Sequence, residues 1–154
     1  MMKIRQYQAA DQDAVWALHK LGVQQVEADL GDGAYTDLHQ IEQVYLRNQG
    51  EFLVGIYEGR LVAMGAVKHT TDERSEIKRM RVHPDVQGRG FGQMMLTILE
   101  ARAVALGYTT LHLDTSSGQD AAIGLYRKNG YRQLDETKVV QGLTLLFLRK
   151  TCGK

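Results

Sequence analysis

A turn rich in glycine is the segment whose residue types and spacing point most directly to chemistry. It reads Val-His-Pro-Asp-Val-Gln-Gly-Arg-Gly-Phe-Gly over residues 82–92, with glycine at alternate positions 88, 90 and 92. Glycine adopts positive φ angles and lets a ligand approach the backbone closely. Where such a turn opens a helix, unbonded N–H groups and the positive end of the helix dipole are presented together. The turn is therefore predicted to bind a pyrophosphate.

Two other kinds of phosphate-binding loop are excluded by spacing. A dinucleotide-binding turn has the pattern G-x-G-x-x-G, but the sixth position is Gln93 when counted from Gly88 and Met95 when counted from Gly90. A Walker loop ends in Gly-Lys followed by Ser or Thr, and the turn has no such run. The alternative that stays open is a tight strand-to-helix connection whose glycines serve steric needs alone.

Hydrophobic periodicity and turn residues place this segment within a mixed α/β chain. The first half of the chain is predicted to form a strand at 4–7, a helix from 11, a helix containing Leu38, Ile41 and Tyr45, and strands at 51–57, 61–68 and 76–82. The second half is predicted to form a helix at about 90–106, a strand at 109–114, a helix at about 119–128, and strands at 131–134 and 139–149. The helix at about 90–106 has a predicted buried stripe of Phe91, Met94, Met95, Ile98 and Leu99. Hairpins together with one βαβ crossover favour an α/β (α+β) fold, with a mixed central sheet of about seven strands flanked by about four helices.

The strand that precedes the turn carries an unusual number of charges. Glu76, Lys78, Arg79 and Arg81 fall within six residues and are predicted to place charge on both faces of a central strand. Burying such charges in a packed core is expensive. We therefore expect this strand to line an open cleft, unless its charges pair with one another, for example Glu76 with Lys78.

Composition sets the broad class of the protein. The 154 residues of the chain are expected to form one domain, with residues about 150–154 as a frayed tail. The chain has 19 basic and 18 acidic residues, and this balance argues against a dedicated nucleic-acid or membrane-surface binder. A single cysteine, Cys152, favours a reducing, cytoplasmic location, and no apolar run is long enough for a signal core or a transmembrane span. The five histidines lack ligand spacing, so we expect no metal.

Two motifs in the second half of the chain resemble those of one family. Gln87-x-x-Gly90-x-Gly92 resembles the Q/R-x-x-G-x-G/A motif of GNAT acetyltransferases, as does its Val-His-Pro lead-in. Downstream, Gln119-x-x-Ala122-x-x-Leu125-Tyr126-x-x-x-Gly130-Tyr131 is similar to the family's second block and stands at the usual separation. The order of elements along nearly the whole chain also resembles the GNAT fold. The run over residues 113–119 further resembles a camello-like subgroup, which also carries glutamine at position 119.

This resemblance implies an N-acetyltransferase that uses acetyl-CoA as co-substrate and transfers its acetyl group to a primary amine by direct attack in a ternary complex. By position, Met80 and Val82 would pair with the pantetheine arm, and the Val82 N–H would face the thioester oxygen. Gln119 stands where the family usually has asparagine. The pyrophosphate would be held by Gln87, Gly88, Arg89, Gly90, Phe91 and Gly92. The alternative for Arg89 is simple solvation.

The resemblance also implies two catalytic residues. Tyr126 lies where the family often has the acid that protonates the departing thiolate, and a phenol suits that role. The alternative is a tyrosine packed under its helix with its hydroxyl bonded to the backbone. Glu76 resembles the strand glutamate that serves as base in histone-acetylating members. A base is needed because an amine with a pKa of about 10.4 is mostly protonated at pH 7.

The acceptor amine is left open between two classes. In the family, the loops at about 27–35 and 135–141 shape the acceptor cleft, and here they are acidic, with Glu27, Asp29 and Asp32 in the first and Asp135 and Glu136 in the second. An acidic rim would suit a cationic amine, whereas Arg79 and Arg81 would suit a substrate carboxylate on an amino acid or peptide. Rival functions are an acetyl-CoA-binding regulatory module without turnover and a transferase of another acyl group. Homodimerisation through the apolar strand 143–148 is also possible, while nucleic-acid and membrane partners are not expected.

Overall fold

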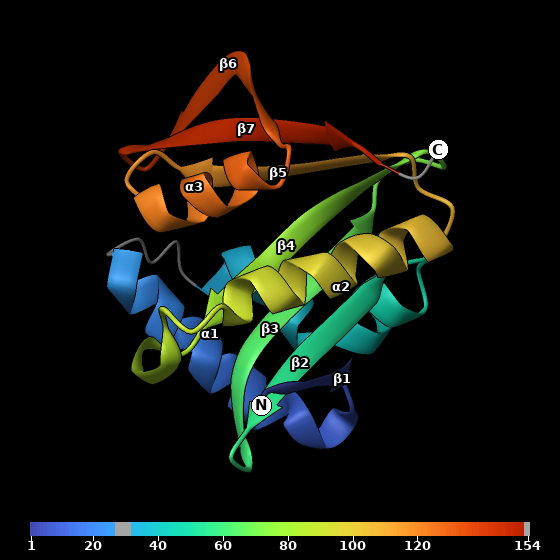
Figure 1. Cartoon of the computed structure of the whole chain (residues 1–154), viewed down its shortest axis with the longest axis vertical. Helices are drawn as coiled ribbons and strands as arrows, with labels where there is room; N and C mark the ends of the chain where they lie inside the picture. The colour runs from blue at the N-terminus through green and yellow to red at the C-terminus, as the bar shows by residue number, and fades with distance from the viewer. Residues whose placement is uncertain (27–31, 153–154) are drawn as a thin grey trace.

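The computed structural model describes residues 1–26 and 32–152, in which seven strands form one mixed sheet of order β1-β2-β3-β4-β5-β7-β6 (Figure 1). The strands are β1 (Lys3–Gln6), β2 (Glu51–Tyr57), β3 (Arg60–His69), β4 (Arg74–Val82), β5 (Thr110–Ser116), β6 (Arg132–Val140) and β7 (Leu143–Thr151). Every neighbouring pair is antiparallel except β4 with β5, which are parallel. The predicted mixed sheet of about seven strands is confirmed.

Helices cover both faces of the sheet (Figure 1). On one face, α2 (Phe91–Ala105) and α3 (Asp120–Lys128) pack in a core that includes Leu53 of β2. On the other face, α1 (Gln12–Val26) packs with Phe52 and Val54 in a second core. Neighbouring residues of β2 thus serve opposite cores, as the period of two in a strand requires.

The second predicted helix takes a less regular form. The chain forms a 3₁₀ helix, η2 (Asp32–His39), with a kink at Tyr35, and then one π-helical turn, η3 (Glu42–Leu46). The three residues that predicted this helix, Leu38, Ile41 and Tyr45, are all buried in the second core. Their spacing therefore identified the buried face correctly, although the segment is not a continuous α-helix.

A β-bulge in β4 shapes the centre of the molecule. Met64 of β3 faces Arg81 and Ala66 faces Lys78, so one residue of β3 opposes two of β4. Arg79 lies in this bulge with a φ of 59°, and bulges bend a strand and end its regular pairing. β4 separates from β5 just before the bulge, since the two strands pair only from Arg74–Glu76 to Thr110–His112 and then diverge (Figure 1).

The bulge corrects the expectation that the charges of β4 lie on both faces. Arg79 contacts η2 and Arg81 contacts α1, both on the same face, and Glu76 and Lys78 line the same cavity as these arginines. The extra residue at the bulge brings Arg79 to this face although it follows Lys78 directly. The prediction that the strand lines a cleft is confirmed, and no ion pair joins Glu76 to Lys78 in the part of the chain that the structure describes.

The last two strands form a hairpin whose turn differs from the predicted one. Gln141 and Gly142 have φ angles of 49° and 82° and form a two-residue turn, the conformation that suits strand twist in tight hairpins. The predicted loop at 135–141 is therefore wrong, since Asp135 and Glu136 lie within β6 where its register shifts. Strand β7 extends to Thr151, and the Cys152 N–H donates to the Thr109 carbonyl (2.7 Å), so these residues of the expected tail are paired.

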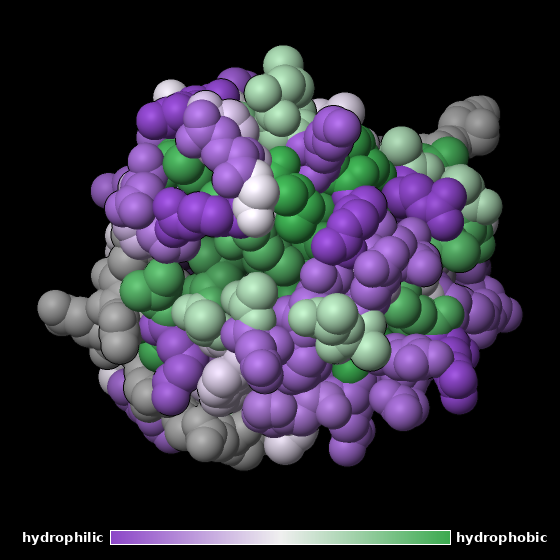
Figure 2. Space-filling model, turned by 90° about the horizontal axis from the view of Figure 1, so that it is seen from below, coloured by the Kyte–Doolittle hydropathy of each residue, from purple (hydrophilic) through white to green (hydrophobic). Residues whose placement is uncertain are grey.

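The surface is largely hydrophilic. In the view of Figure 2, apolar side chains gather in the middle of the face and hydrophilic ones surround them. Across the described residues, the large apolar side chains that are exposed are Met1, Ile98, Val104, Leu106 and Val139. None of the helices described is both long and apolar enough to cross a membrane.

Candidate active site

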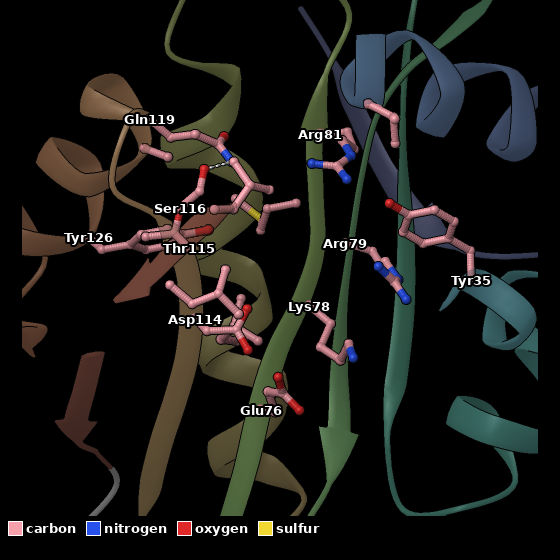
Figure 3. A pocket seen from close by; sticks show the side chains of 16 residues that line it. Tyr35, Glu76, Lys78, Arg79, Arg81, Asp114, Thr115, Ser116, Gln119 and Tyr126 are labelled. Atoms are coloured by element: carbon pink, nitrogen blue, oxygen red, sulfur yellow. Dashed lines mark hydrogen bonds between the residues drawn. The ribbon is translucent and has the colours of Figure 1, made fainter. Parts of the chain in front are cut away.

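Two cavities meet where β4 and β5 separate. The larger, of about 500 Å³, lies between the end of β4 and the first turns of α2 and α3. The smaller, of about 210 Å³, lies between β4, β5 and the α1 side of the sheet (Figure 3). Both are lined by Met80, Arg81, Gln119, Ala122 and Tyr126. A ligand in one cavity can therefore meet a ligand in the other at these residues.

The glycine-rich turn forms the outer wall of the larger cavity. Gly88 and Gly90 have φ angles of 81° and 82°, and a Cβ built on either would meet no atom within 4 Å. The left-handed conformation, rather than crowding by the protein, thus requires glycine there. Gly90 is the N-cap residue of α2 and no side chain caps this helix, so its first N–H groups are available to an anion. The lining residues of the predicted turn are Gln87, Gly88, Gly90, Phe91 and Gly92.

Arg89 is the one residue of the predicted pyrophosphate set that does not line this cavity. Its Nη1 donates a hydrogen bond to the Tyr57 hydroxyl (3.1 Å), and the guanidinium lies 5.7 Å from the centroid of that ring. The structure thus directs Arg89 toward the end of β2. Arg89 is an exposed residue, and its role beside the pyrophosphate stays a prediction.

The end of β4 turns an unpaired edge toward the gap. The His83 N–H donates to the Val62 carbonyl of β3 (2.7 Å). Successive N–H groups of a strand point to opposite edges, so the Val82 N–H and, two residues before it, that of Met80 point away from β3. β5 has already diverged at this level. The Gln87 side chain donates to the Val82 carbonyl (3.1 Å) and so links the turn to this edge.

Tyr126 of α3 lies where the two cavities meet, with 6% of its surface exposed. Its ring packs edge-on against Tyr131, with centroids 5.6 Å apart. Within the described residues its hydroxyl makes no hydrogen bond, so the alternative of a hydroxyl bonded to the backbone does not hold. Burial raises the pKa of Tyr126 to about 12, against a lowering by Arg81. The hydroxyl therefore keeps its proton at any ordinary pH.

The smaller cavity contains two carboxylates. Glu76 lines it at the last paired position of β4, opposite His112 of β5. Asp114, two residues further along β5, lines the same cavity and was not identified from the sequence. Alternation could have found it, since Leu111 and Leu113 are buried in the core and so direct His112 and Asp114 to the other face. Burial lowers the pKa of His112, while Glu76 opposes this change.

Arg79 is fully engaged within the protein. Its Nη2 and Nε donate to the two carboxylate oxygens of Asp37 (2.7 and 3.0 Å), and the Tyr45 hydroxyl donates to the same carboxylate (2.6 Å). Burial acts to raise the pKa of Asp37, but the Arg79 guanidinium outweighs it and holds this pKa below its usual value. The guanidinium also lies 5.2 Å from the centroid of the Tyr35 ring. Arg79 thus joins the bulge of β4 to η2.

Arg81 has no such partner. Its side chain lies against Gly22 of α1, where a Cβ would come within 2.5 Å of the Arg81 Cδ. Across residues 1–26 and 32–152 its guanidinium makes no hydrogen bond or ion pair, and Nε is fully buried without a partner. Burial, followed by the charge of Arg79, lowers the pKa of Arg81. The two arginines that the sequence analysis treated together are therefore different, one neutralised and one not.

The remaining predicted residues are placed as follows. Gln119 caps the start of α3, lines both cavities and donates through Nε2 to the Ser116 hydroxyl (3.2 Å). Glu27 and Asp29 lie outside the described residues, as does the side chain of Asp32. The exposed Asp135 and Glu136 of β6 line neither cavity. On the neighbouring strand β7, Leu143 and Leu145 line the smaller cavity, so part of this apolar strand serves the site.

The known proteins that resemble this chain in sequence and fold are acetyltransferases. Residues 9–131 match the acetyltransferase (GNAT) family. Among curated proteins, the chain is 28% identical over 123 residues to the uncharacterized N-acetyltransferase YjgM of Escherichia coli, spanning 73% of this chain and 74% of that protein. It is 38% identical over 81 residues to an IAA acetyltransferase of Azospirillum brasilense, of which it spans about half, 53%.

Solved structures give the same result for the fold. An acetyltransferase from Streptococcus agalactiae superposes with a TM-score of 0.88 at 19% identity over 98% of both chains. The acetyltransferase yncA from Salmonella typhimurium, solved with acetyl-CoA, superposes with a TM-score of 0.78 at 20% identity over 98% of this chain and 94% of that one. With a family match across most of its length, the chain belongs to the GNAT acetyltransferases.

Proposed function

We propose that this GNAT acetyltransferase uses acetyl-CoA and transfers the acetyl group to the nitrogen of a primary amine, with both substrates bound at once. The observation that carries the proposal is the position of Tyr126. Tyr126 is buried where the two cavities meet, beside the free edge of β4, and its protonated hydroxyl makes no hydrogen bond to the residues that the structure describes. An acid is useful at that point only if a leaving group arrives from one cavity and a nucleophile from the other.

The larger cavity has features that suit acetyl-CoA. The uncapped start of α2 and the left-handed Gly88 and Gly90 offer backbone N–H groups to a pyrophosphate. The free edge at Met80 and Val82 offers strand-type hydrogen bonds to the amide groups of a pantetheine arm. The solved relatives from Salmonella typhimurium and Elizabethkingia anophelis, which both carry acetyl-CoA, share this fold.

The residues that line the two cavities divide the chemical work. Glu76, in the smaller cavity, is the proposed base, which takes a proton from the acceptor ammonium directly or through water, so that the nitrogen can form its bond to the acetyl carbon. The Val82 N–H donates a hydrogen bond where negative charge develops on the carbonyl oxygen. Tyr126 donates to the sulfur as the carbon–sulfur bond breaks. The nitrogen loses two protons, one to Glu76 before attack and one after the carbon–nitrogen bond has formed, and the thiolate takes up one, so the products are an amide, free CoA and one released proton.

The test is calorimetric titration with acetyl-CoA followed by a free-thiol release assay across a panel of primary amines. Saturable binding with thiol release on one class of amine is the expected result. Binding without release on any amine would favour the regulatory module that holds acetyl-CoA without turnover. Faster release from propionyl- or succinyl-CoA than from acetyl-CoA would favour a different acyl group. Failure to bind any of these thioesters would refute the proposal.

A further inference from the structure

We propose that Arg81 binds a carboxylate of the acceptor, so that the substrate is a small amino acid acetylated on its amine. The inference rests on the function proposed above and names its substrate class. Of the arginines on β4, only Arg81 lines both cavities, so it lies beside the point where acyl transfer is proposed. A carboxylate held there would bring a nearby amine to the reacting centre.

Within residues 1–26 and 32–152, no carboxylate forms an ion pair with Arg81. An arginine side chain stays protonated in proteins, and an uncompensated buried charge is strongly unfavourable. Asp37, the carboxylate on the same face of the sheet, already binds Arg79 through both oxygens. A bound anion would supply the missing partner and give the buried Nε an acceptor.

Glu76 of the smaller cavity is too far along the strand to be that partner. It precedes Arg81 by five positions on β4, roughly 16–17 Å at the usual rise of a strand before the shortening caused by the bulge. In Figure 3 Glu76 and Arg81 stand at opposite ends of the cavity. Glu76 is thus no partner for Arg81, and a small amino acid bound by its carboxylate at Arg81 would keep its amine at the same end of the cavity, where the two cavities meet.

The guanidinium is also held in place. Gly22 leaves room for the Arg81 side chain, since a Cβ there would lie 2.5 Å from Cδ and 2.7 Å from Nε. A fixed guanidinium presents a planar pair of N–H donors, which matches the geometry of a carboxylate. The volume of about 210 Å³ lies below the 300–1,000 Å³ typical of drug-sized ligands. This size favours a small acceptor over an aminoglycoside.

The experiment compares each amino acid with its own carboxamide as acceptor in the thiol-release assay. For the preferred amino acid we expect a kcat/KM about 10- to 150-fold above that of its amide, the range given by a charge-assisted hydrogen bond. Arg81→Gln should bring this ratio close to one, mainly through loss of activity on the acid, and Arg81→Lys should be intermediate. Gly22→Ala keeps the charge but displaces the side chain and should raise KM for the acid alone. Arg74→Gln, an exposed arginine of the same strand outside both cavities, is the control.

Four outcomes would overturn the inference. Equal rates with acid and amide in the wild type would show that no acceptor carboxylate is bound, whether or not the variants fold. A tenfold weaker acetyl-CoA affinity in Arg81→Gln with an unchanged acid-to-amide ratio would assign Arg81 to the cofactor. A preference for succinyl-CoA that is lost in the variant would place the carboxylate on the acyl donor. Thiol release with no amine at all would refute the proposed function itself, the succinyl-CoA result would change its acyl group, and the first two outcomes leave it standing.

Discussion

Replacing Tyr126 by phenylalanine removes one oxygen from the point where the two cavities meet. The ring should stay in place because it packs on Tyr131, and the hydroxyl makes no hydrogen bond in the described structure that would be lost. The variant should therefore fold with nearly the stability of the wild type. Any change in turnover can then be attributed to the missing hydroxyl.

The size of the effect follows from the pKa of Tyr126. A phenol with a pKa of about 12 is a weaker acid than a thiol with a pKa of about 8.5. Complete proton transfer ahead of carbon–sulfur cleavage is thus unfavourable, and the main contribution is a hydrogen bond to the sulfur as its charge grows. Such a bond to a charged group is worth about 1.5–3 kcal/mol. Since 1.36 kcal/mol changes a rate tenfold, kcat should fall about 10- to 150-fold.

The assay measures kcat and the KM for acetyl-CoA between pH 6 and 10. Because the Tyr126 pKa lies above this range, its hydroxyl is protonated throughout. Tyr126→Phe should therefore lower the whole pH profile without changing its shape, and KM should move little. A kcat within twofold of the wild type, or a limb of the profile that disappears in the variant, would refute the assignment.

Three further substitutions test other parts of the site. Glu76→Gln should flatten the rise of kcat/KM with pH, and an unaltered profile would assign the base elsewhere, with Asp114→Asn as the first comparison. Gly90→Ala should weaken acetyl-CoA binding about 5- to 30-fold, because a side chain at a φ of 82° costs roughly 1–2 kcal/mol. A normal acetyl-CoA affinity of this variant in calorimetry would contradict pyrophosphate binding by the glycine-rich turn. Asp37→Asn should destabilise the fold by about 3–5 kcal/mol by leaving Arg79 unpaired, a fall in Tm of roughly 6–20 °C for a chain of this size. Since the Asp37 pKa is lowered in the folded state, the stability that Asp37 contributes is present above about pH 4 and is lost as the pH falls further. The Tm values of the variant and the wild type should therefore approach each other in thermal unfolding experiments at acidic pH.

Local sequence signals predicted the regular elements well. Strand β2 has the predicted bounds, and α2 begins within one residue of its predicted start, because a run of apolar residues and a helical stripe depend on near neighbours. The segment from 32 to 46 was harder. Its kink and π turn accompany two hydrogen bonds to Asp37, one from Tyr45 within the segment and one from Arg79, which lies 42 positions further along the chain. Spacing within the segment carries no information about that contact.

The candidate site was predictable where it depends on glycine and less so where it depends on packing. The glycines of the turn predicted residues in the left-handed conformation, and Gly88 and Gly90 adopt it and line the larger cavity. The bulge has no such sequence signal, since its left-handed residue is Arg79. The buried stripe of α2 was also partly misplaced, because Leu96 is buried whereas Ile98 is 38% exposed. Which apolar residue faces the sheet depends on how the helix is rotated, and packing alone decides that.

One extra residue in β4 links the two halves of the site. The bulge follows the last pair of β4 with β5, at Glu76, and by bending the strand it directs the rest of β4, where the N–H groups of Met80 and Val82 have no neighbouring strand. The same residue shifts the alternation of side chains, so that Arg79 turns to Asp37 and Arg81 to the acceptor cavity. The edge proposed to bind the thioester and the charge proposed to select the acceptor thus share one structural cause. Asp37, by fixing Arg79 in the bulge, is therefore expected to influence both, which predicts weaker acetyl-CoA binding in Asp37→Asn at temperatures where the variant is still folded.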